Sequence, residues 1–265
     1  ITVKYKGVSV RRKVVTGTPQ GGVLSPMLWN LVFDGLIALL DGRDGILPVV
    51  FADDIVLLLS GTSFDDIFDK LQDKIKLIVD WGKTRRLTFS SKKSVAILFT
   101  QKYKGIKKHK ERKFLMNGNF LSWVDSTRYL GVILDSRLNF AEHFSTKIKR
   151  CKNLLMKYQL ITRKTWGPDP KYMRWLYKGV ILPTLTFGSI VWWRITKNVT
   201  NRRILHRFQR QVMITWGSFI RSTPTAGLQM ICDVLPLDLK IQEIALKTKL
   251  RIEHIIKPQI TWDGQ

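Results

Sequence analysis

The chain has 265 residues, a length that suits two domains, and 45% of them are hydrophobic, which is enough to form a core. It carries 45 Lys and Arg against 20 Asp and Glu, a formal net charge of +25. Because so large a charge repels itself in a compact state, a polyanion such as nucleic acid is the expected partner. The alternative at this level is a generic basic protein, such as a ribosomal or chromatin component.

The two cysteines, Cys151 and Cys232, are far apart and lack metal-binding spacing, so they exclude a disulfide framework and argue against a zinc site. Free thiols fit a reducing intracellular compartment, and no signal peptide is visible. The longest apolar run, 176–193, contains Lys178 and Pro183, which favours a buried helix over a membrane span. We therefore expect an intracellular protein without a membrane segment.

In chain order, loose alternation over residues 2–15 predicts a β-hairpin. A loop follows, and Ser25-Pro26 is typical of a helix start, with Ser25 as N-cap and Pro26 at the first helical position. Two Val- and Ile-rich strands, 47–51 and 55–59, flank Asp53-Asp54, and their continuous apolar character predicts that both are buried.

Next, Ser63 with Asp66 predicts a capped helix start. The remaining expectations up to residue 134 are strands at 87–89 and 95–99, a lysine-rich loop over 101–113, and a hairpin region over 114–121 and 128–134.

From Phe140 onward the apolar residues follow helical spacing, with further helices expected at 170–182, 200–216 and 237–257. Residues 141–215 carry sixteen Lys or Arg against Glu142 and Asp169, with aromatic residues between them. For the charges we favour contacts to nucleic-acid phosphates, and for most of the aromatics a place in the core. The expected fold class is α+β: an antiparallel sheet with helices over 1–137, then an all-helical part over 138–265.

Asp53 and Asp54 suggest a metal site. Placing two carboxylates side by side between apolar strands is unfavourable unless a cation lies between them. A hairpin tip that holds both suits Mg²⁺, and two-metal phosphoryl transfer uses ions roughly 3.5–4 Å apart. The alternative is a simple Asp-rich turn.

Pro19-Gln20-Gly21-Gly22 precedes that hairpin and suits a substrate loop. Its glycines allow close approach of a template or nucleotide to the backbone, and Gln20 can both donate and accept hydrogen bonds. The helix that follows adds the positive end of its dipole.

These motifs resemble the reverse transcriptases of jockey-like, non-long-terminal-repeat retrotransposons, over nearly the whole chain. Motif B of that family is close to GxPQGxxLSPxLxN and corresponds to Gly17–Asn30, and motif C (FADD or YADD) corresponds to Phe51–Asp54. The motif D region, LxxSPxKT, corresponds to Leu87–Ser94, where Ser91 and Ser94 replace the usual proline and threonine. YLGVxLD matches Tyr129–Asp135, and the thumb segment LYKxxxxPxLxYG matches Leu176–Gly188.

The resemblance implies a polymerase palm over 1–137 with motifs B to E, a helical thumb and C-terminal extension over 138–265, and no fingers. It implies RNA-directed DNA polymerase activity: a DNA primer, an RNA template, deoxynucleoside triphosphates and Mg²⁺. Asp53 and Asp54 would be the catalytic metal ligands, and Lys93, otherwise a solvated lysine, would lie near the nucleotide phosphates. The other implied contacts are Pro19, Gln20, Gly21, Gly22, Phe51 and Ala52 for template and nucleotide, Tyr129, Leu130, Gly131 and Val132 for the primer, and Arg150, Lys152, Lys157, Arg163 and Lys164 for the nucleic-acid backbone.

One departure limits this expectation. Such polymerases use a third carboxylate, in motif A, upstream of motif B, and this sequence has no acidic residue before Asp34. We therefore expect the 265 residues alone to polymerise poorly, and a non-catalytic nucleic-acid-binding remnant is the alternative. The PQGGVLSP and YLGV motifs argue against a group II intron or telomerase-like reverse transcriptase. The resemblance places the protein in the nucleus, at the site of DNA insertion.

Overall fold

The computed structural model describes residues 2–11, 21–41, 45–100, 106–161, 169–217 and 219–256. By its contacts the chain divides into two compact units, Ile1–Val124 and Asp125–Gln265. This division falls before the second hairpin region, whereas the expected palm–thumb boundary at 137/138 follows it. The assignment of palm and thumb stays a prediction.

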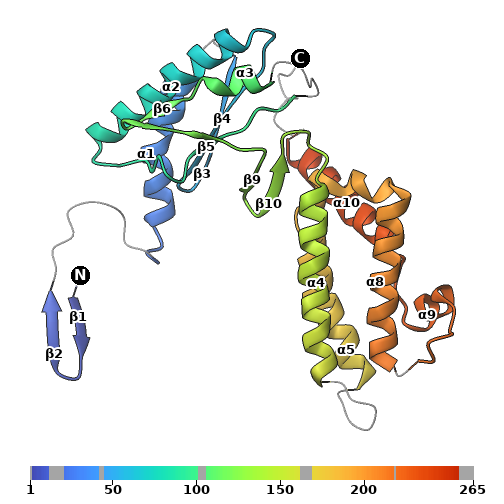
Figure 1. The fold of residues 1–265 in the computed structure, drawn as a ribbon. Coiled ribbons are helices and arrows are strands. Elements are labelled where there is room, and N and C mark those ends of the chain that lie inside the picture. The colour runs from blue at the N-terminus through green and yellow to red at the C-terminus, as the bar shows by residue number, and fades with distance from the viewer. Residues whose placement is uncertain are drawn as a thin grey trace, which may run out of the picture. The chain divides into compact units, whose positions relative to one another are not determined.

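The first unit begins with the predicted hairpin, in which β1 (Thr2–Tyr5) pairs antiparallel with β2 (Val8–Arg11). Helix α1 spans Ser25–Leu40 (Figure 1), and Leu24 lies in the cap position without a side-chain cap. The prediction of Ser25 as N-cap is therefore wrong by one residue, because Ser25 already belongs to the first turn. Pro26 lies in that first turn, where its missing N–H costs no helical hydrogen bond.

Strands β3 (Ile46–Phe51) and β4 (Asp54–Leu59) form the antiparallel hairpin that carries the two aspartates. Helix α2 (Phe64–Thr84) follows, and Ser63 Oγ caps it by accepting from the Asp66 N–H at 3.4 Å, as predicted. The hairpin packs with both helices on a core whose buried members are Phe33, Leu36, Leu40, Ile78 and Trp81.

Burial of both strands of this hairpin is not observed. Leu47 and Leu58, directly opposite each other, are 59% and 41% exposed. Val50, Ile55 and Leu57 pack on the helices, so one side of the two-stranded ribbon is covered and the other is open in the described part of the chain. A continuous apolar run predicts that both faces of a strand are buried, but it does not show whether this chain supplies elements that cover each face.

The rest of the unit has short elements: β5 (Val95–Ala96), α3 (Ile106–Glu111), β6 (Leu115–Met116), β7 (Asn119–Phe120) and β8 (Ser122–Trp123). The strand predicted at 87–89 is absent, and the lysine-rich loop contains α3. Among the described strands, β5 and β8 pair in parallel, and every sheet has two strands. The expected single antiparallel sheet is therefore not observed among the described residues, which form separate two-stranded sheets together with helices.

The second unit opens with the antiparallel hairpin of β9 (Ser126–Tyr129) and β10 (Val132–Asp135) and is helical thereafter, as predicted (Figure 1). Its long helices are α4 (Ala141–Ile161), α8 (Val199–Gly217) and α10 (Leu237–Ile256). Between them lie α5 (Pro170–Leu176), a π-helical turn (Tyr177–Ile181), α6 (Leu182–Thr186), α7 (Ser189–Trp192), a 3₁₀ turn (Trp193–Lys197) and α9 (Thr225–Ile231).

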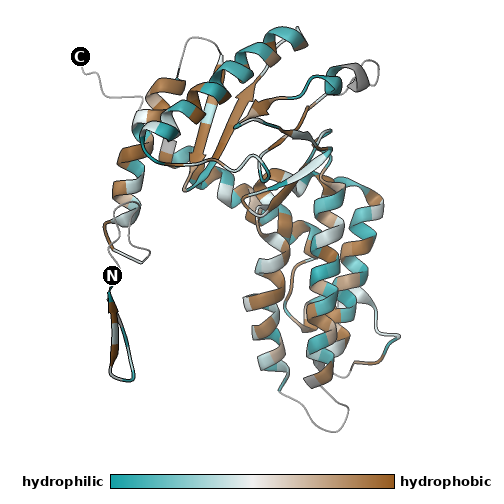
Figure 2. Ribbon diagram, turned by 60° about the vertical axis from the view of Figure 1, so that its left-hand side comes forward, coloured by the Kyte–Doolittle hydropathy of each residue, from teal (hydrophilic) through white to brown (hydrophobic). Residues whose placement is uncertain are grey.

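Both polar and apolar residues occur along each of these long helices (Figure 2), the pattern of amphipathic helices that share a core. That core includes Trp192, Phe208, Met213 and the two free cysteines. Among the described residues, none of the helices combines the length and the apolar character that a bilayer crossing requires.

Candidate active site

The turn between β3 and β4 presents the two aspartates at the end of the hairpin. Phe51 pairs with Asp54, which leaves Ala52 and Asp53 as a two-residue turn. Ala52 has a φ of +52°, the left-handed backbone that primed hairpin turns require at this position. Asp53 and Asp54 are both exposed, and neither side-chain carboxylate has a hydrogen-bond or ion-pair partner among the described residues. Their carboxylates are therefore free to bind a cation.

Helix α1 holds this turn through Trp29. The indole Nε1–H donates to the Ala52 carbonyl at 2.8 Å, across 23 positions of sequence. The Trp29 ring lies 4.7 Å from Phe33, which in turn meets the buried Trp81 edge-on at 5.5 Å. The motif B helix and the motif C turn are thus joined directly. Trp29 was not expected from the sequence, because the motif leaves its position unspecified.

The donor set at the hairpin fits Mg²⁺ in kind, because carboxylate oxygens are the ligands that this hard cation prefers. It is not a full set within the described residues, where no group of three or more His, Cys, Asp or Glu side chains comes together. Asp53 and Asp54 can supply part of a metal site, and a complete one needs a further ligand.

The other predicted residues of the first unit are placed as follows. Gly21 has a φ of +85°, and the space that a Cβ would occupy is open, so the backbone there is accessible. The Gly22 carbonyl accepts from the Ser25 N–H at 3.2 Å. Phe51 and Lys93 are exposed, and no described contact joins Lys93 to either aspartate. Pro19 and Gln20 lie outside the described residues.

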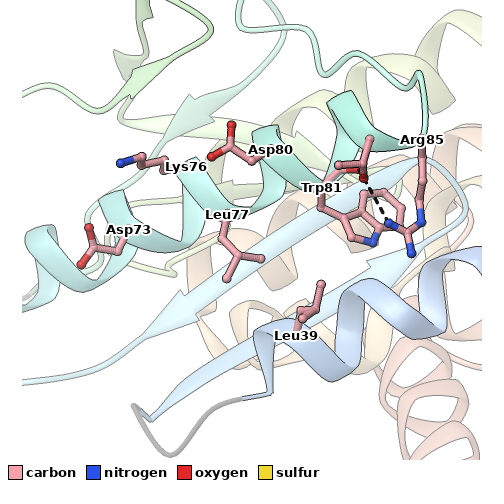
Figure 3. Close-up of a pocket in the computed structure, with 8 residues that line it drawn as sticks. Leu39, Asp73, Lys76, Leu77, Asp80, Trp81 and Arg85 are labelled. Carbon is pink, nitrogen blue, oxygen red and sulfur yellow. Dashed lines mark hydrogen bonds between the residues drawn. The ribbon is translucent and has the colours of Figure 1, made fainter.

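A separate hollow of about 580 Å³ lies between α1 and α2 (Figure 3). It is lined by Leu39, by the α2 side chains from Asp73 to Thr84 that face it, and by Arg85. The Arg85 guanidinium covers the Trp81 ring at 4.6 Å and donates to Thr84 Oγ1 at 3.3 Å. None of the predicted site residues lines this hollow.

In the second unit, the predicted primer-binding residues form the tip of the β9–β10 hairpin. Tyr129 pairs with Val132, and the turn residues Leu130 and Gly131 have φ values of +45° and +83°. These left-handed conformations give a primed turn, which explains the glycine. The Asp135 carboxylate then accepts from the backbone N–H groups of Asn139 (3.0 Å) and Phe140 (2.7 Å), fixing the connection into α4.

A buried histidine supports the same hairpin. His143 is 1% exposed, and its Nδ1 accepts from the Ile133 N–H at 3.1 Å. Its Nε2 has no hydrogen-bond partner among the described residues. Burial, together with the positive charges of Lys147 and Arg128, lowers the pKa of His143 to about 4. The ring is therefore neutral at pH 7, with its proton on Nε2.

Arg150, Lys152 and Lys157 are exposed on α4, as a backbone-binding role requires, and Arg163 and Lys164 lie outside the described residues. By helical periodicity Arg150 and Lys157 share a face, while Lys152 points away from it. Most of the described aromatics of this region are buried or half-buried as predicted, and Tyr172, Trp175 and Phe187 are exposed exceptions.

The sequence model of the reverse transcriptase (RNA-dependent DNA polymerase) family matches residues 2–134, half of the chain, and so spans the loop, the helix and the aspartate hairpin. The chain belongs to this family.

Its relatives place it among retrotransposon proteins. The Pol polyprotein from type-1 retrotransposable element R1 of Nasonia vitripennis is 28% identical over 226 residues, 84% of this chain and 66% of the relative. The R1 protein of Bradysia coprophila is 28% identical over 91% of this chain and 24% of its own length. The RNA-directed DNA polymerase from mobile element jockey of Drosophila funebris is 24% identical, over 89% and 25% respectively.

The chain thus spans between a quarter and two thirds of these relatives. The resemblance to reverse transcriptases of non-long-terminal-repeat retrotransposons is confirmed. No solved structure matches the chain significantly.

Proposed function

We propose that this chain is the palm-and-thumb part of an RNA-directed DNA polymerase that copies RNA onto a DNA primer, in the nucleus, at a site of retrotransposon insertion. The observation that carries the proposal is the aspartate hairpin. Two exposed carboxylates, of the turn residue Asp53 and of the first β4 residue Asp54, lie at a hairpin tip that the motif B helix holds through Trp29. The net charge of +25 supports a nucleic-acid partner.

In the proposed reaction, the primer 3′ hydroxyl attacks the α-phosphate of a deoxynucleoside triphosphate. A phosphorus–oxygen bond to the primer forms, the bond to pyrophosphate breaks, and the hydroxyl proton passes to solvent water. Asp53 and Asp54 would hold Mg²⁺, which when bound stabilises the attacking and leaving oxygens. Holding both carboxylates at a fixed hairpin tip lowers the cost of ordering them at the moment of reaction.

The remaining roles are divided between the two units. Pro19, Gln20, Gly21 and Gly22, with Phe51 and Ala52, would position template and nucleotide, and Lys93 would offset phosphate charge. In the second unit the Tyr129–Val132 turn would hold the primer, and the basic residues of α4 would contact the backbone of the duplex. Such contacts should be largely independent of sequence and should weaken steeply as salt rises.

A primer-extension assay tests this proposal, using the full-length protein that contains these residues, an RNA template, a DNA primer and Mg²⁺. Replacing a direct metal ligand, as in Asp53→Asn, should lower extension by more than about 100-fold while leaving duplex binding nearly unchanged. Asp34→Asn is the matched control, because Asp34 is an exposed carboxylate on α1 of the same unit. Equal activity of the two variants would refute the assignment of the hairpin.

A second candidate function is nucleic-acid binding without catalysis. It is favoured by the finding that no three metal-ligand side chains come together among the described residues. For the 265-residue chain alone we expect duplex binding with little or no extension. Robust extension by this chain would show that it needs no further carboxylate.

A further inference from the structure

In the second unit, two turns that are far apart in sequence lie against each other beside α4. The tip of the β9–β10 hairpin meets the segment that follows α6. A Cβ on Gly131 would lie 2.8 Å from Phe187 Cε1, and a Cβ on Gly188 would lie 2.8 Å from Val132 Cγ2. Both glycines also have positive φ, +83° and +67°. A side chain at either position is therefore disfavoured by its backbone conformation as well as by the close contact.

This close packing fixes Phe187 without burying it. The ring lies against the hairpin tip, yet the residue is 52% exposed. Leaving a large aromatic side chain exposed forgoes the stabilisation that its burial would give. A rigidly held, half-exposed ring is a ready surface for a partner with a flat or apolar face.

Positive charge lies beside this ring. Lys147 of α4 places its ammonium 4.8 Å from the centre of the Phe187 ring and donates to the Thr184 carbonyl at 3.2 Å. Burial lowers the pKa of Lys147, and the Arg150 guanidinium lowers it further; Cys151 opposes this shift, and Arg128 adds a smaller lowering effect. Both arginines are exposed. None of the three cations has a carboxylate partner among the described residues.

Three cations gathered without a counter-charge repel one another, and an anionic ligand relieves that repulsion. Lysine and arginine contact phosphates, and an adjacent aromatic ring adds an apolar contact for a base or sugar, which is the combination found where proteins bind nucleic-acid strands. An acidic peptide would pair with the cations but gives no reason for the exposed ring.

We propose that Lys147, Arg128, Arg150 and Phe187 form a contact site for a nucleic-acid strand, called here the strand-contact site. The three cations bind consecutive phosphates, and the phenyl ring packs against a sugar or a base. The inference rests on the proposed function, because it names where a template–primer duplex meets the second unit. It adds Lys147, Arg128 and Phe187 to the contacts that sequence motifs assign.

The test measures binding of the 265-residue chain to a labelled RNA–DNA duplex by fluorescence anisotropy over a range of salt concentrations. Losing one phosphate contact should lower affinity about fivefold to tenfold at about 0.1 M salt and reduce the slope of log affinity against log salt by about 0.9. We expect this of Lys147→Gln. Lys149→Gln is the control: it removes the same charge from α4, but roughly 200° around the helix. Lys147→Arg should retain wild-type binding.

Phe187→Leu tests the ring separately from charge. Affinity should fall at least about fivefold with an unchanged salt slope, as expected for loss of an aromatic contact. Tyr172→Leu, at an exposed aromatic residue of α5, should bind as wild type does. If Lys147→Gln does not fold, Phe187→Leu and Arg150→Gln decide the question.

Equal affinities for Lys147→Gln and Lys149→Gln together with no effect of Phe187→Leu would overturn the proposal. So would displacement of the duplex by polyglutamate at equal charge concentration, which would assign the site to an acidic protein partner. If the variants behave as expected but the full-length protein shows no primer extension, the polymerase proposal fails and the strand-contact site stands. If the full-length protein extends the primer but the variants bind the duplex as wild type does, the strand-contact site fails and the polymerase proposal stands.

Discussion

Lowering the pH should destabilise the second unit through His143. Its pKa is about 4 in the folded chain, because the ring is buried beside two cations. In the unfolded chain a histidine has a pKa near 6.5. Between these values the unfolded chain takes up a proton that the folded chain does not, so the free energy of unfolding falls as the pH falls. The contribution is fully present above about pH 6.5 and is lost progressively down to about pH 4.

The structure gives the size and the cause of this effect. Protonation of Nδ1 would replace the acceptor of the Ile133 N–H with a second donor facing it, in a site where His143 is 1% exposed. Since one pKa unit corresponds to about 1.4 kcal/mol, the loss should be about 2 kcal/mol at pH 5 and about 3 kcal/mol below pH 4.

Urea unfolding of the 265-residue chain at pH 7 and pH 5, followed by circular dichroism, measures this loss. His143→Gln keeps an acceptor for the Ile133 N–H but does not titrate, so its free energy of unfolding should depend on pH less than that of wild type by about 2 kcal/mol over this interval. His254→Gln, at an exposed histidine of α10, should keep the wild-type dependence. The same pH dependence in wild type and His143→Gln would refute the reasoning.

Two further predictions concern the first unit. Trp29→Phe removes the hydrogen bond to the Ala52 carbonyl. It should lower the free energy of unfolding by about 1 kcal/mol and also slow primer extension by the full-length protein. The control Trp123→Phe loses a comparable bond to the Arg112 carbonyl and should destabilise similarly without slowing extension, so equal extension rates in the two variants would contradict a positioning role for Trp29. Gly82→Ala would place a Cβ 2.8 Å from both the Leu87 carbonyl oxygen and Phe89 Cε2, so it should destabilise by about 1–3 kcal/mol in thermal unfolding. Gly35→Ala has its nearest neighbour at 3.8 Å and should instead stabilise by up to about 1 kcal/mol, and the same sign for both glycines would contradict the packing described for α2.

The family and the hairpins and long helices around the candidate site could be predicted from the sequence, although the strand expected at 87–89 is absent and α3 was not expected. The elements follow from local rules: alternation predicts the hairpins, helical spacing predicts α2, α4 and α8, and a tight turn between apolar strands places Asp53 and Asp54 at the hairpin tip. Ser63 was found as a cap for the same reason, because a cap acts within one helical turn.

Tertiary structure alone decided which distant residues support the candidate site. Trp29 contacts Ala52, His143 contacts Ile133, and Gly131 contacts Phe187. The two residues of each pair are separated in sequence, and local sequence patterns do not predict which separated residues come together. The exposed outer face of β3–β4 and the parallel pairing of β5 with β8 were missed for the same reason. Periodicity reports which side of an element is apolar, whereas what covers that side depends on contacts between elements.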